Sequence, residues 1–138
     1  MPAPDFIDTN ILVYAYDAGD QRKQQIAQDI LRRAIAGEFV VSMQVFAEFA
    51  ATLLHKVSPP ANPENVADLL AVLTFIPAIA PDAEMITRAV EARLRYGIHF
   101  YDGMIIAAAE RTGCARIWSE DLNPGQSYFG VVVENPFL

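Results

Sequence analysis

Short apolar runs that suit β-strands alternate along this chain with longer segments of helical periodicity. The candidate strands cover 6–7, 38–41, 75–79, 115–118 and 131–134. The candidate helices cover 21–35, 43–57, 62–73, 82–96 and 101–112, and 9–16 is either a short helix or an extension of the first strand. Pro77 removes a ladder donor, so the run that contains it is expected at a sheet edge. Because strands alternate with helices, the pattern predicts an α/β fold with helices on the faces of a parallel sheet.

The chain has the length of one domain with one well-covered core. It has 138 residues, of which 53% are apolar, and these numbers predict a single domain over residues 1–138. Its 10 Lys and Arg against 17 Asp and Glu leave a formal net charge of −7. This balance argues against a generic basic nucleic-acid coat, but not against an enzyme that holds phosphates through metal ions.

Cysteine use and hydropathy favour the cytoplasm. Cys114 is the single cysteine and cannot form an internal disulfide, so a reducing compartment is the simplest interpretation. Residues 1–6 show no basic region followed by an apolar run, and we expect no signal peptide. The most apolar stretch, 69–81, is shorter than the ~20 residues that span a bilayer. We therefore expect no membrane insertion.

Two acids lie just after candidate strands, and a third lies on the apolar face of a candidate helix. Asp8 follows the strand at 6–7, and Asp121 lies shortly after the strand at 115–118. Ligands of α/β sheets bind outside the carboxyl ends of the strands, so both acids are candidate site residues. Asp102 lies on the apolar face of its helix, where a carboxylate is either desolvated or directed into a site. The alternative for Asp102 is an ordinary acid of the first helical turn, which the helix dipole favours.

Glu48 neither follows a candidate strand nor lies on the apolar face of its helix. A helical wheel places the apolar residues of its helix opposite and leaves Gln44, Thr52 and His55 on its own side. Periodicity alone therefore predicts a solvated glutamate. Only a cleft on this polar side would make Glu48 functional.

Convergence of these four carboxylates would create a site for a hard cation. Carboxylate oxygens without histidine or thiolate partners suit Mg²⁺ or Mn²⁺, which keep waters and bind substrate phosphates. Crowded carboxylates repel one another, so such a cluster makes physical sense chiefly around metal ions. The corresponding chemistry is phosphodiester hydrolysis.

Four short segments and a C-terminal tail follow one another at a characteristic spacing. They are FIDTNILVY at 6–14, SMQVFAE at 42–48, HFYDGMIIAAA at 99–109, SEDL at 119–122 and VVVENPF at 131–137. Together they resemble the PIN domain family, and within it the VapC-type toxins of prokaryotic toxin–antitoxin pairs. The resemblance covers nearly the whole chain and depends on the order of the segments, since none is specific alone. It implies a three-layer α/β sandwich in which helices flank a small parallel sheet.

The resemblance also implies a metal-dependent endoribonuclease that hydrolyses RNA phosphodiester bonds with Mg²⁺ or Mn²⁺. The acids that would carry this activity are Asp8, Glu48, Asp102 and Asp121. By the family pattern, Asp8 and Asp102 are the principal metal ligands, and the other two complete the site directly or through water. The resemblance makes Glu48 a good candidate despite its periodicity.

Polar neighbours of the acids are expected to support the site. They are Thr9, Asn10 and Ser119. The family usually has threonine where this chain has Ser119, which keeps the hydroxyl and loses a methyl group, so we expect the chemistry to be unaffected. His55 and His99 are interpreted as surface or loop histidines without a catalytic role.

The resemblance further implies three kinds of partner. The first is an RNA substrate, for which Phe100 and Tyr101 beside Asp102 are candidate base contacts. The second is a cognate antitoxin whose C-terminal part would occupy the active-site groove. The third is a second copy of the chain, since the family commonly forms homodimers and the helices at 62–73 and 83–96 could form the seam.

Other function classes stay open from the sequence. A PIN-like module that binds RNA or protein without cutting would have no need of an unfavourable carboxylate cluster. A small-molecule phosphohydrolase with an aspartyl nucleophile usually offers a second aspartate, which the segment 8–10 lacks. A nucleotide-cofactor enzyme is disfavoured because neither GxGxxG nor GxxxxGK[ST] occurs. Whether the chain is a toxin or a standalone nuclease also stays open.

Overall fold

The structure, a computed structural model, describes residues 3–138 and alternates strands with helices. The strands are β1 (Asp5–Ile7), β2 (Phe39–Ser42), β3 (Ala78–Ile79), β4 (Arg116–Trp118), β5 (Ser127–Tyr128) and β6 (Val131–Glu134). The helices are α1 (Thr9–Ala15), α2 (Gln21–Ile35), α3 (Met43–Ala51), the π-helical turn η1 (Thr52–Lys56), α4 (Pro63–Leu73), α5 (Ala83–Tyr96) and α6 (Phe100–Arg111). Residues 1 and 2 of the predicted domain 1–138 lie outside the described part.

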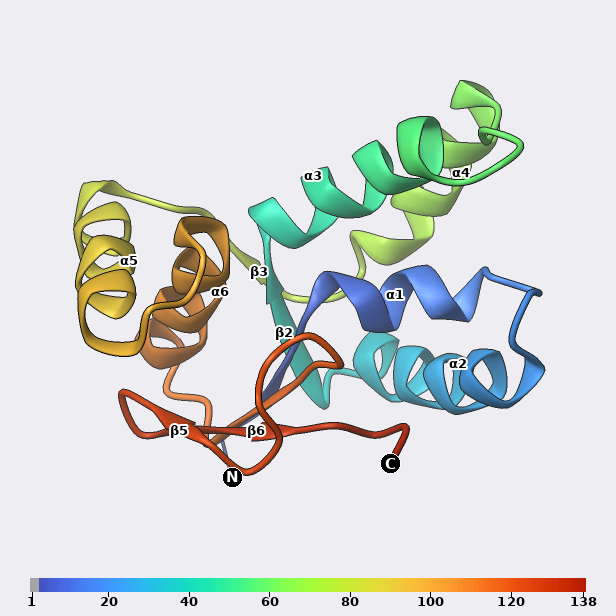
Figure 1. Cartoon of the computed structure of the whole chain (residues 1–138). Coiled ribbons are helices and arrows are strands. Elements are labelled where there is room, and N and C mark those ends of the chain that lie inside the picture. Colours follow the sequence, from blue (N-terminus) through green and yellow to red (C-terminus); the bar gives the residue numbers. More distant parts are fainter. Residues whose placement is uncertain (1–2) are drawn as a thin grey trace.

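One mostly parallel sheet forms the middle layer. Its strand order is β3-β2-β1-β4-β6-β5, and every neighbouring pair is parallel except β5 and β6. Figure 1 shows α5 and α6 on one side of the sheet, α1 and α2 on the other, and α3 and α4 above α1. The predicted fold class, an α/β sandwich around a small parallel sheet, is confirmed.

The strands agree with the sequence pattern except at the two edges of the sheet. The predicted strand at 75–79 forms only over its last residues, Ala78–Ile79, and lies at the edge as Pro77 predicted. At the other edge, β5 pairs antiparallel with β6 and was not predicted. Two residues are too few to show a periodic pattern, so only the pairing with β6 reveals this strand.

Side-chain caps explain where the helices begin. Asp20, Ser42 and Asp82 each accept a hydrogen bond from the backbone N–H three residues later. At α6 the cap is His99, whose Nδ1 accepts from the N–H of Tyr101 at 3.2 Å. This cap starts α6 one residue earlier than the sequence predicted.

The predicted single helix over 43–57 is wrong in its last part. α3 ends at Ala51, and the five residues of η1 form a π-helical turn. The i→i+5 bonds of such a turn are rare and often occur at functional sites. Hydrophobic periodicity does not distinguish this wider turn from an α-helix, so no local pattern indicated it.

The core forms between the sheet and the helices on both of its faces. Its large members, each at most 1% exposed, include Phe6, Phe39, Phe49, Ile105, Ile106 and Ile117. α6 approaches α5 closely at Gly103, where a Cβ atom would lie 2.7 Å from the carbonyl oxygen of Ala89. The missing side chain therefore allows the backbones of α5 and α6 to touch, which fixes the position of the neighbouring Asp102.

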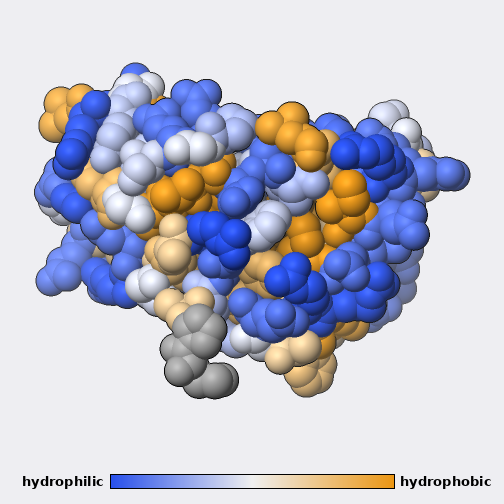
Figure 2. All heavy atoms as spheres, turned by 90° about the horizontal axis from the view of Figure 1, so that it is seen from below, coloured by the Kyte–Doolittle hydropathy of each residue, from blue (hydrophilic) through white to orange (hydrophobic). Residues whose placement is uncertain are grey.

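Apolar groups on the surface are scattered on one end of the molecule. Figure 2 shows the molecule from below the view of Figure 1, the side on which β5 and β6 lie, and apolar patches there are separated by hydrophilic atoms. Among the helices that the structure describes, none combines the length and hydrophobicity needed to cross a membrane.

Candidate active site

Asp8 lies at the carboxyl end of β1 and is the N-cap of α1. It is only 5% exposed. Its Oδ1 accepts a hydrogen bond of 2.7 Å from the N–H of Thr9, and its Oδ2 accepts one of 2.7 Å from the hydroxyl of Ser119. Burial raises the pKa of Asp8 to about 7 despite these bonds, and the charges of Asp121 and Asp102 raise it further. The environment of the Asp8 carboxylate therefore favours binding of a proton or a cation.

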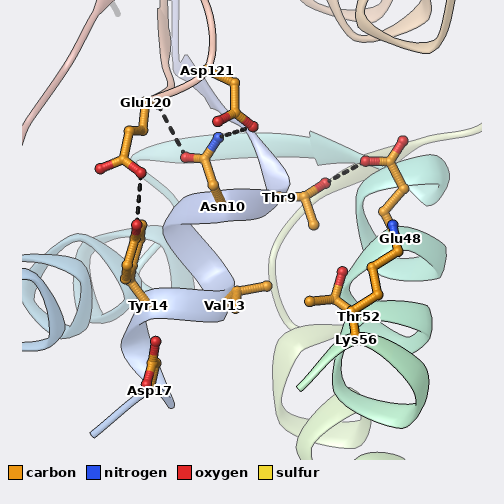
Figure 3. Close-up of a pocket in the computed structure, with 10 residues that line it drawn as sticks. All are labelled: Thr9, Asn10, Val13, Tyr14, Asp17, Glu48, Thr52, Lys56, Glu120 and Asp121. Atoms are coloured by element: carbon orange, nitrogen blue, oxygen red, sulfur yellow. Dashed lines mark hydrogen bonds between the residues drawn. The ribbon is translucent and has the colours of Figure 1, made fainter. Parts of the chain in front are cut away.

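Asn10 connects α1 to the segment that follows β4. Its Nδ2 donates to Oδ2 of Asp121 at 3.1 Å and to Oγ of Ser119 at 3.3 Å. Its Oδ1 accepts from the N–H of Glu120 at 3.2 Å. Figure 3 shows Asn10 between Glu120 and Asp121 at the start of α1. These bonds hold Asp121 close to the N-terminus of α1.

Glu48 faces α1 rather than open solvent. Thr9 donates its hydroxyl to Oε2 of Glu48 at 3.0 Å, as Figure 3 shows, and Nε2 of Gln44 donates to Oε1 at 2.6 Å. Periodicity predicted that Glu48 is freely solvated. This prediction is wrong, because the start of α1 covers part of the polar side of α3. Gln44 Nε2 also donates to the carbonyl oxygen of Tyr101 at 3.0 Å, which joins α3 to α6.

Asp102 lies half-buried in the first turn of α6. Burial raises its pKa, and the charge of Asp121 raises it as well. The charge of His99 lowers this pKa, and that of Glu48 raises it. Of the two interpretations of Asp102, the desolvated carboxylate therefore describes it better than an ordinary solvated acid of the first turn.

The structure brings all seven predicted site residues to the carboxyl ends of the parallel strands. They are Asp8, Thr9, Asn10, Glu48, Asp102, Ser119 and Asp121. They come from the β1–α1 junction, α3, α6 and the segment after β4. The charges of Asp121 and Asp102 raise the pKa of Asp8, and the charges of Asp121 and Glu48 raise the pKa of Asp102. The four carboxylates are therefore electrostatically linked to one another.

Two hollows adjoin at Glu48. The first, which we name the Asp121 hollow, has a volume of about 370 Å³ and is also lined by Thr9, Asn10, Tyr14 and Glu120. The second, the Tyr101 hollow, has a volume of about 520 Å³ and is also lined by Gln44, His99 and Asp102. Glu48, Thr52 and Lys56 line both. The hollows therefore form a groove along one side of α3 and η1.

The donor set of this site suits a hard cation that keeps part of its water. Within residues 3–138, no three His, Cys, Asp or Glu side chains are already grouped as a metal cluster. The acids instead accept hydrogen bonds from hydroxyl and N–H groups. All of the candidate ligands are oxygen atoms, and Mg²⁺ in proteins is usually held by one or two carboxylates and several waters. The residues therefore fit Mg²⁺ or Mn²⁺ better than a soft metal.

Sequence reasoning missed a second group of residues beside Asp121. The hydroxyl of Tyr14 donates to Oε1 of Glu120 at 2.6 Å, and the ammonium of Lys23 forms an ion pair with Oε2. These contacts join α1 and α2 to the segment after β4, and no local pattern predicts them. Gln44 was also missed as a site residue, although its position one helical turn before Glu48 could have indicated the contact.

The chain is similar to one known family and to several solved structures. The family profile described as "PIN domain" matches residues 6–126. A toxin–antitoxin complex from Klebsiella pneumoniae has a TM-score of 0.71 and 18% identity, with 96% of this chain and 97% of that chain covered. VapC20 of Mycobacterium tuberculosis, described as a sarcin–ricin loop cleaving toxin, has a TM-score of 0.66 and 19% identity, with 84% and 88% covered.

A third similar structure is VapBC2 from Rickettsia felis, bound to a DNA fragment from its promoter. It has a TM-score of 0.66 and 20% identity, with 94% of this chain and 96% of that chain covered. A comparison with curated protein sequences gave no match. At these identities, the solved structures share the fold with this chain.

Proposed function

The chain belongs to the PIN domain family, and on this premise we propose that it is a metal-dependent endoribonuclease, the toxin of a type II toxin–antitoxin pair. The observation that carries the proposal is the convergence of four carboxylates from separate elements. The charges of Asp121 and Asp102 act on Asp8, whose pKa is raised to about 7, and the charge of Glu48 acts on Asp102. Mutual repulsion makes such a group unfavourable in a module that only binds. It suits the divalent ions of phosphodiester hydrolysis.

We assign the four carboxylates to metal binding. Asp8 and Asp102 are the proposed principal ligands of Mg²⁺ or Mn²⁺, and Glu48 and Asp121 complete the site directly or through water. Such an ion, when bound, stabilises charge on phosphoryl oxygens and makes water more acidic. Because the pKa values of Asp8 and Asp102 are raised, the two groups release protons when a cation binds, and affinity should increase with pH.

Neighbouring polar groups have the role of positioning the carboxylates. The hydroxyl of Ser119 holds Oδ2 of Asp8, and the amide of Asn10 holds Oδ2 of Asp121. The short bond from Ser119 supports the expectation that serine can replace the usual threonine here. Positioning matters because a misplacement of about 1 Å can cost about 100-fold in rate.

The substrate that we propose is RNA, with the reacting phosphate at the junction of the two hollows beside Glu48. VapC20 is described as cleaving the sarcin–ricin loop, which supports structured RNA as the class to test first. Without a cation, the acidic groove would repel phosphates, so binding and hydrolysis should share one metal requirement.

The test is incubation of the purified chain, free of antitoxin, with tRNAs and ribosomal RNA fragments in Mg²⁺, Mn²⁺ or EDTA. We expect discrete cuts that require metal and are lost in Asp8→Asn and Asp102→Asn, while Mn²⁺ binding weakens and both variants stay folded. Asp29→Asn, which changes an exposed acid on α2, is the matched control and should cut like the wild type.

Two results would contradict this proposal in different ways. Full activity of Asp8→Asn or Asp102→Asn would overturn the site assignment. A wild-type chain that neither cuts these RNAs nor binds Mn²⁺ would instead favour a PIN-like module that binds without cutting.

We also propose two protein partners. One is an antitoxin, supported by the toxin–antitoxin complex among the similar structures; an arginine of this partner would suit the acidic groove in place of a metal ion. The other is a second copy of the chain, because α5 carries an exposed apolar stripe at four-residue spacing, Ile86, Val90 and Leu94. Cytoplasmic location follows from the same proposed role.

A further inference from the structure

The Tyr101 hollow is lined by two of the proposed metal ligands, Glu48 and Asp102, and also by residues that hydrolysis alone does not require. We propose that it binds one unpaired nucleotide of the RNA substrate, with the base stacked on Tyr101 and a phosphate held by Lys56. The inference rests on the proposed ribonuclease function and specifies which form of RNA the site accepts.

Tyr101 is an exposed aromatic residue whose ring packs against two neighbouring rings. It is 56% exposed. Its ring stacks on the imidazole of His99, with centroids 5.8 Å apart and planes at 25°, and the ring of Phe100 lies edge-on at 5.2 Å. His99 Nδ1 accepts its N–H, and Gln44 donates to its carbonyl oxygen. An exposed ring whose backbone is held by hydrogen bonds and whose side packs on other rings is a suitable stacking platform for an RNA base.

Lys56 provides the positive charge of this groove. It is exposed at the end of η1, and among residues 3–138 it is the only Lys or Arg that lines either hollow. It forms no ion pair within this part of the chain. In a protein with a net charge of −7, a free lysine beside an acidic site is suited to a phosphate of the substrate.

The spacing between Lys56 and Glu48 separates this phosphate from the reacting one. Gln44, Glu48, Thr52 and Lys56 follow at four-residue intervals along α3 and η1, so they line one side of the groove. Eight residues of helix correspond to roughly 10 Å along the axis. Lys56 therefore binds a neighbouring phosphate of the backbone, whereas the carboxylates act on another.

Stacking on Tyr101 requires a base that is not paired. Bases inside a duplex are already stacked on both faces, and only bases of loops, bulges or single strands can be splayed out onto an aromatic ring. The Tyr101 hollow therefore selects unpaired RNA segments over duplexes. The selection comes from stacking and backbone charge, so it tolerates different bases.

The experiment uses the RNA that the wild-type chain cuts and measures kcat and KM over a range of NaCl concentrations. The variants are Tyr101→Ala, Tyr101→Phe and Lys56→Ala. The controls are Arg32→Ala, which removes an exposed cation from α2, and His55→Ala, which removes an exposed ring beside Lys56. Ten-nucleotide oligouridylate, alone or paired with oligoadenylate, serves as a competing probe.

We expect Tyr101→Ala to raise KM roughly 5- to 150-fold, the range that corresponds to loss of one base stack, and Tyr101→Phe to restore most of the affinity. Lys56→Ala should raise KM and lower the slope of log KM against log salt by about 0.7, the value for one phosphate contact on a single strand. Tyr101→Ala should leave this slope unchanged, both controls should match the wild type, and the unpaired probe should inhibit more strongly than the duplex.

Failure of the inference can be distinguished from failure of the proposed function. Three results, each with metal-dependent cutting retained, would overturn the nucleotide site but not the proposed nuclease activity. They are a wild-type KM in Tyr101→Ala, an unchanged salt slope in Lys56→Ala, and equal inhibition by the duplex and the unpaired probe. A wild-type chain that cuts no RNA overturns both.

Discussion

At the scale of single residues, Asp8 has two roles with opposite requirements. As the N-cap of α1 it accepts from a backbone N–H, which favours the charged carboxylate. As a residue that is 5% exposed among other acids, it favours the protonated form, and burial dominates. Asp82, the exposed N-cap of α5, shows the opposite behaviour, because hydrogen bonds from Arg111 and from the N–H of Met85 lower its pKa. The raised pKa of Asp8 therefore reflects mainly the burial of its carboxyl group, and the charges of Asp121 and Asp102 add to it.

The raised pKa of Asp8 predicts a pH dependence of stability for the metal-free protein. In the unfolded chain the carboxyl releases its proton near pH 4, whereas in the folded protein it does so near pH 7. The folded state therefore binds more protons between these values, and the free energy of unfolding falls as pH rises, by about 1.4 kcal/mol per pH unit from this group. Thermal unfolding in EDTA from pH 4 to pH 8 measures the effect.

Asp8→Asn should flatten this pH dependence and stabilise the metal-free protein near pH 8, since an amide has no charge to bury. Asp29→Asn, an exposed acid, should leave the curve unchanged. Mn²⁺ should raise the stability of the wild type most at the high-pH end, because a cation binds the charged form. If Asp8→Asn kept the wild-type slope, the raised pKa would be wrong.

At the scale of elements, the position of α6 depends on its close approach to α5. Gly103 permits this approach, and the residues on its N-terminal side, Tyr101 and Asp102, line the Tyr101 hollow. On the opposite side, Gln44 of α3 holds the carbonyl of Tyr101. The start of α6 therefore lies between α5, which it approaches at Gly103, and α3, which contacts it through Gln44.

Gly103→Ala tests this arrangement. The new Cβ would lie 2.7 Å from the backbone oxygen of Ala89, which cannot turn aside as a side chain could. Overpacking lowers the free energy of unfolding by about 1–3 kcal/mol, and the better helix propensity of alanine raises it by about 1 kcal/mol. We expect a net loss of stability in urea unfolding, together with lower activity from a displaced Asp102.

The matched control is Gly19→Ala, whose new Cβ would meet only the side chain of Asp17 at 3.0 Å. This variant should unfold and cut like the wild type. Equal stability of Gly103→Ala and the wild type would show that α5 and α6 can move apart at little cost in free energy.

At the scale of the whole molecule, the site and the proposed dimer seam use different sides. The carboxylates lie at the ends of parallel strands, where the β1–α1 junction, α3, α6 and the segment after β4 meet. The apolar stripe on α5 lies on a helix in an outer layer (Figure 1). Leu94, the most exposed member at 83%, gains most from burial against a second copy.

Leu94→Glu should therefore dissociate the dimer. Burial of a leucine contributes about 1.5–3 kcal/mol, and replacement by a charge removes this gain, so the dissociation constant should rise at least 10-fold. Analytical ultracentrifugation over a concentration series measures the change. Gln25→Glu, which adds the same charge to an exposed position of α2, should keep the wild-type association. A wild-type chain that stays monomeric throughout the series contradicts the proposed seam.

The sequence was sufficient for features that depend on local chemistry. Helical periodicity located the helices, caps such as Ser42 and Asp82 located their starts, and short apolar runs located the parallel strands. Asp8 and Asp121 were predicted as site residues because ligands of α/β sheets bind outside the carboxyl ends of the strands. The charge of Asp121 on Asp8 agrees with that placement.

Tertiary structure decided the features that depend on residues distant in the chain. Periodicity assigned Glu48 to solvent, because a helical wheel cannot show that Thr9 will lie 3.0 Å away. Local patterns also did not predict the pairing of β5 or the π-helical turn that ends at Lys56. The same holds for the contacts of Glu120 with Tyr14 and Lys23. Local patterns determine which elements form, but the environment of a polar side chain is set by whichever element packs against it, and only the folded chain brings that element into place.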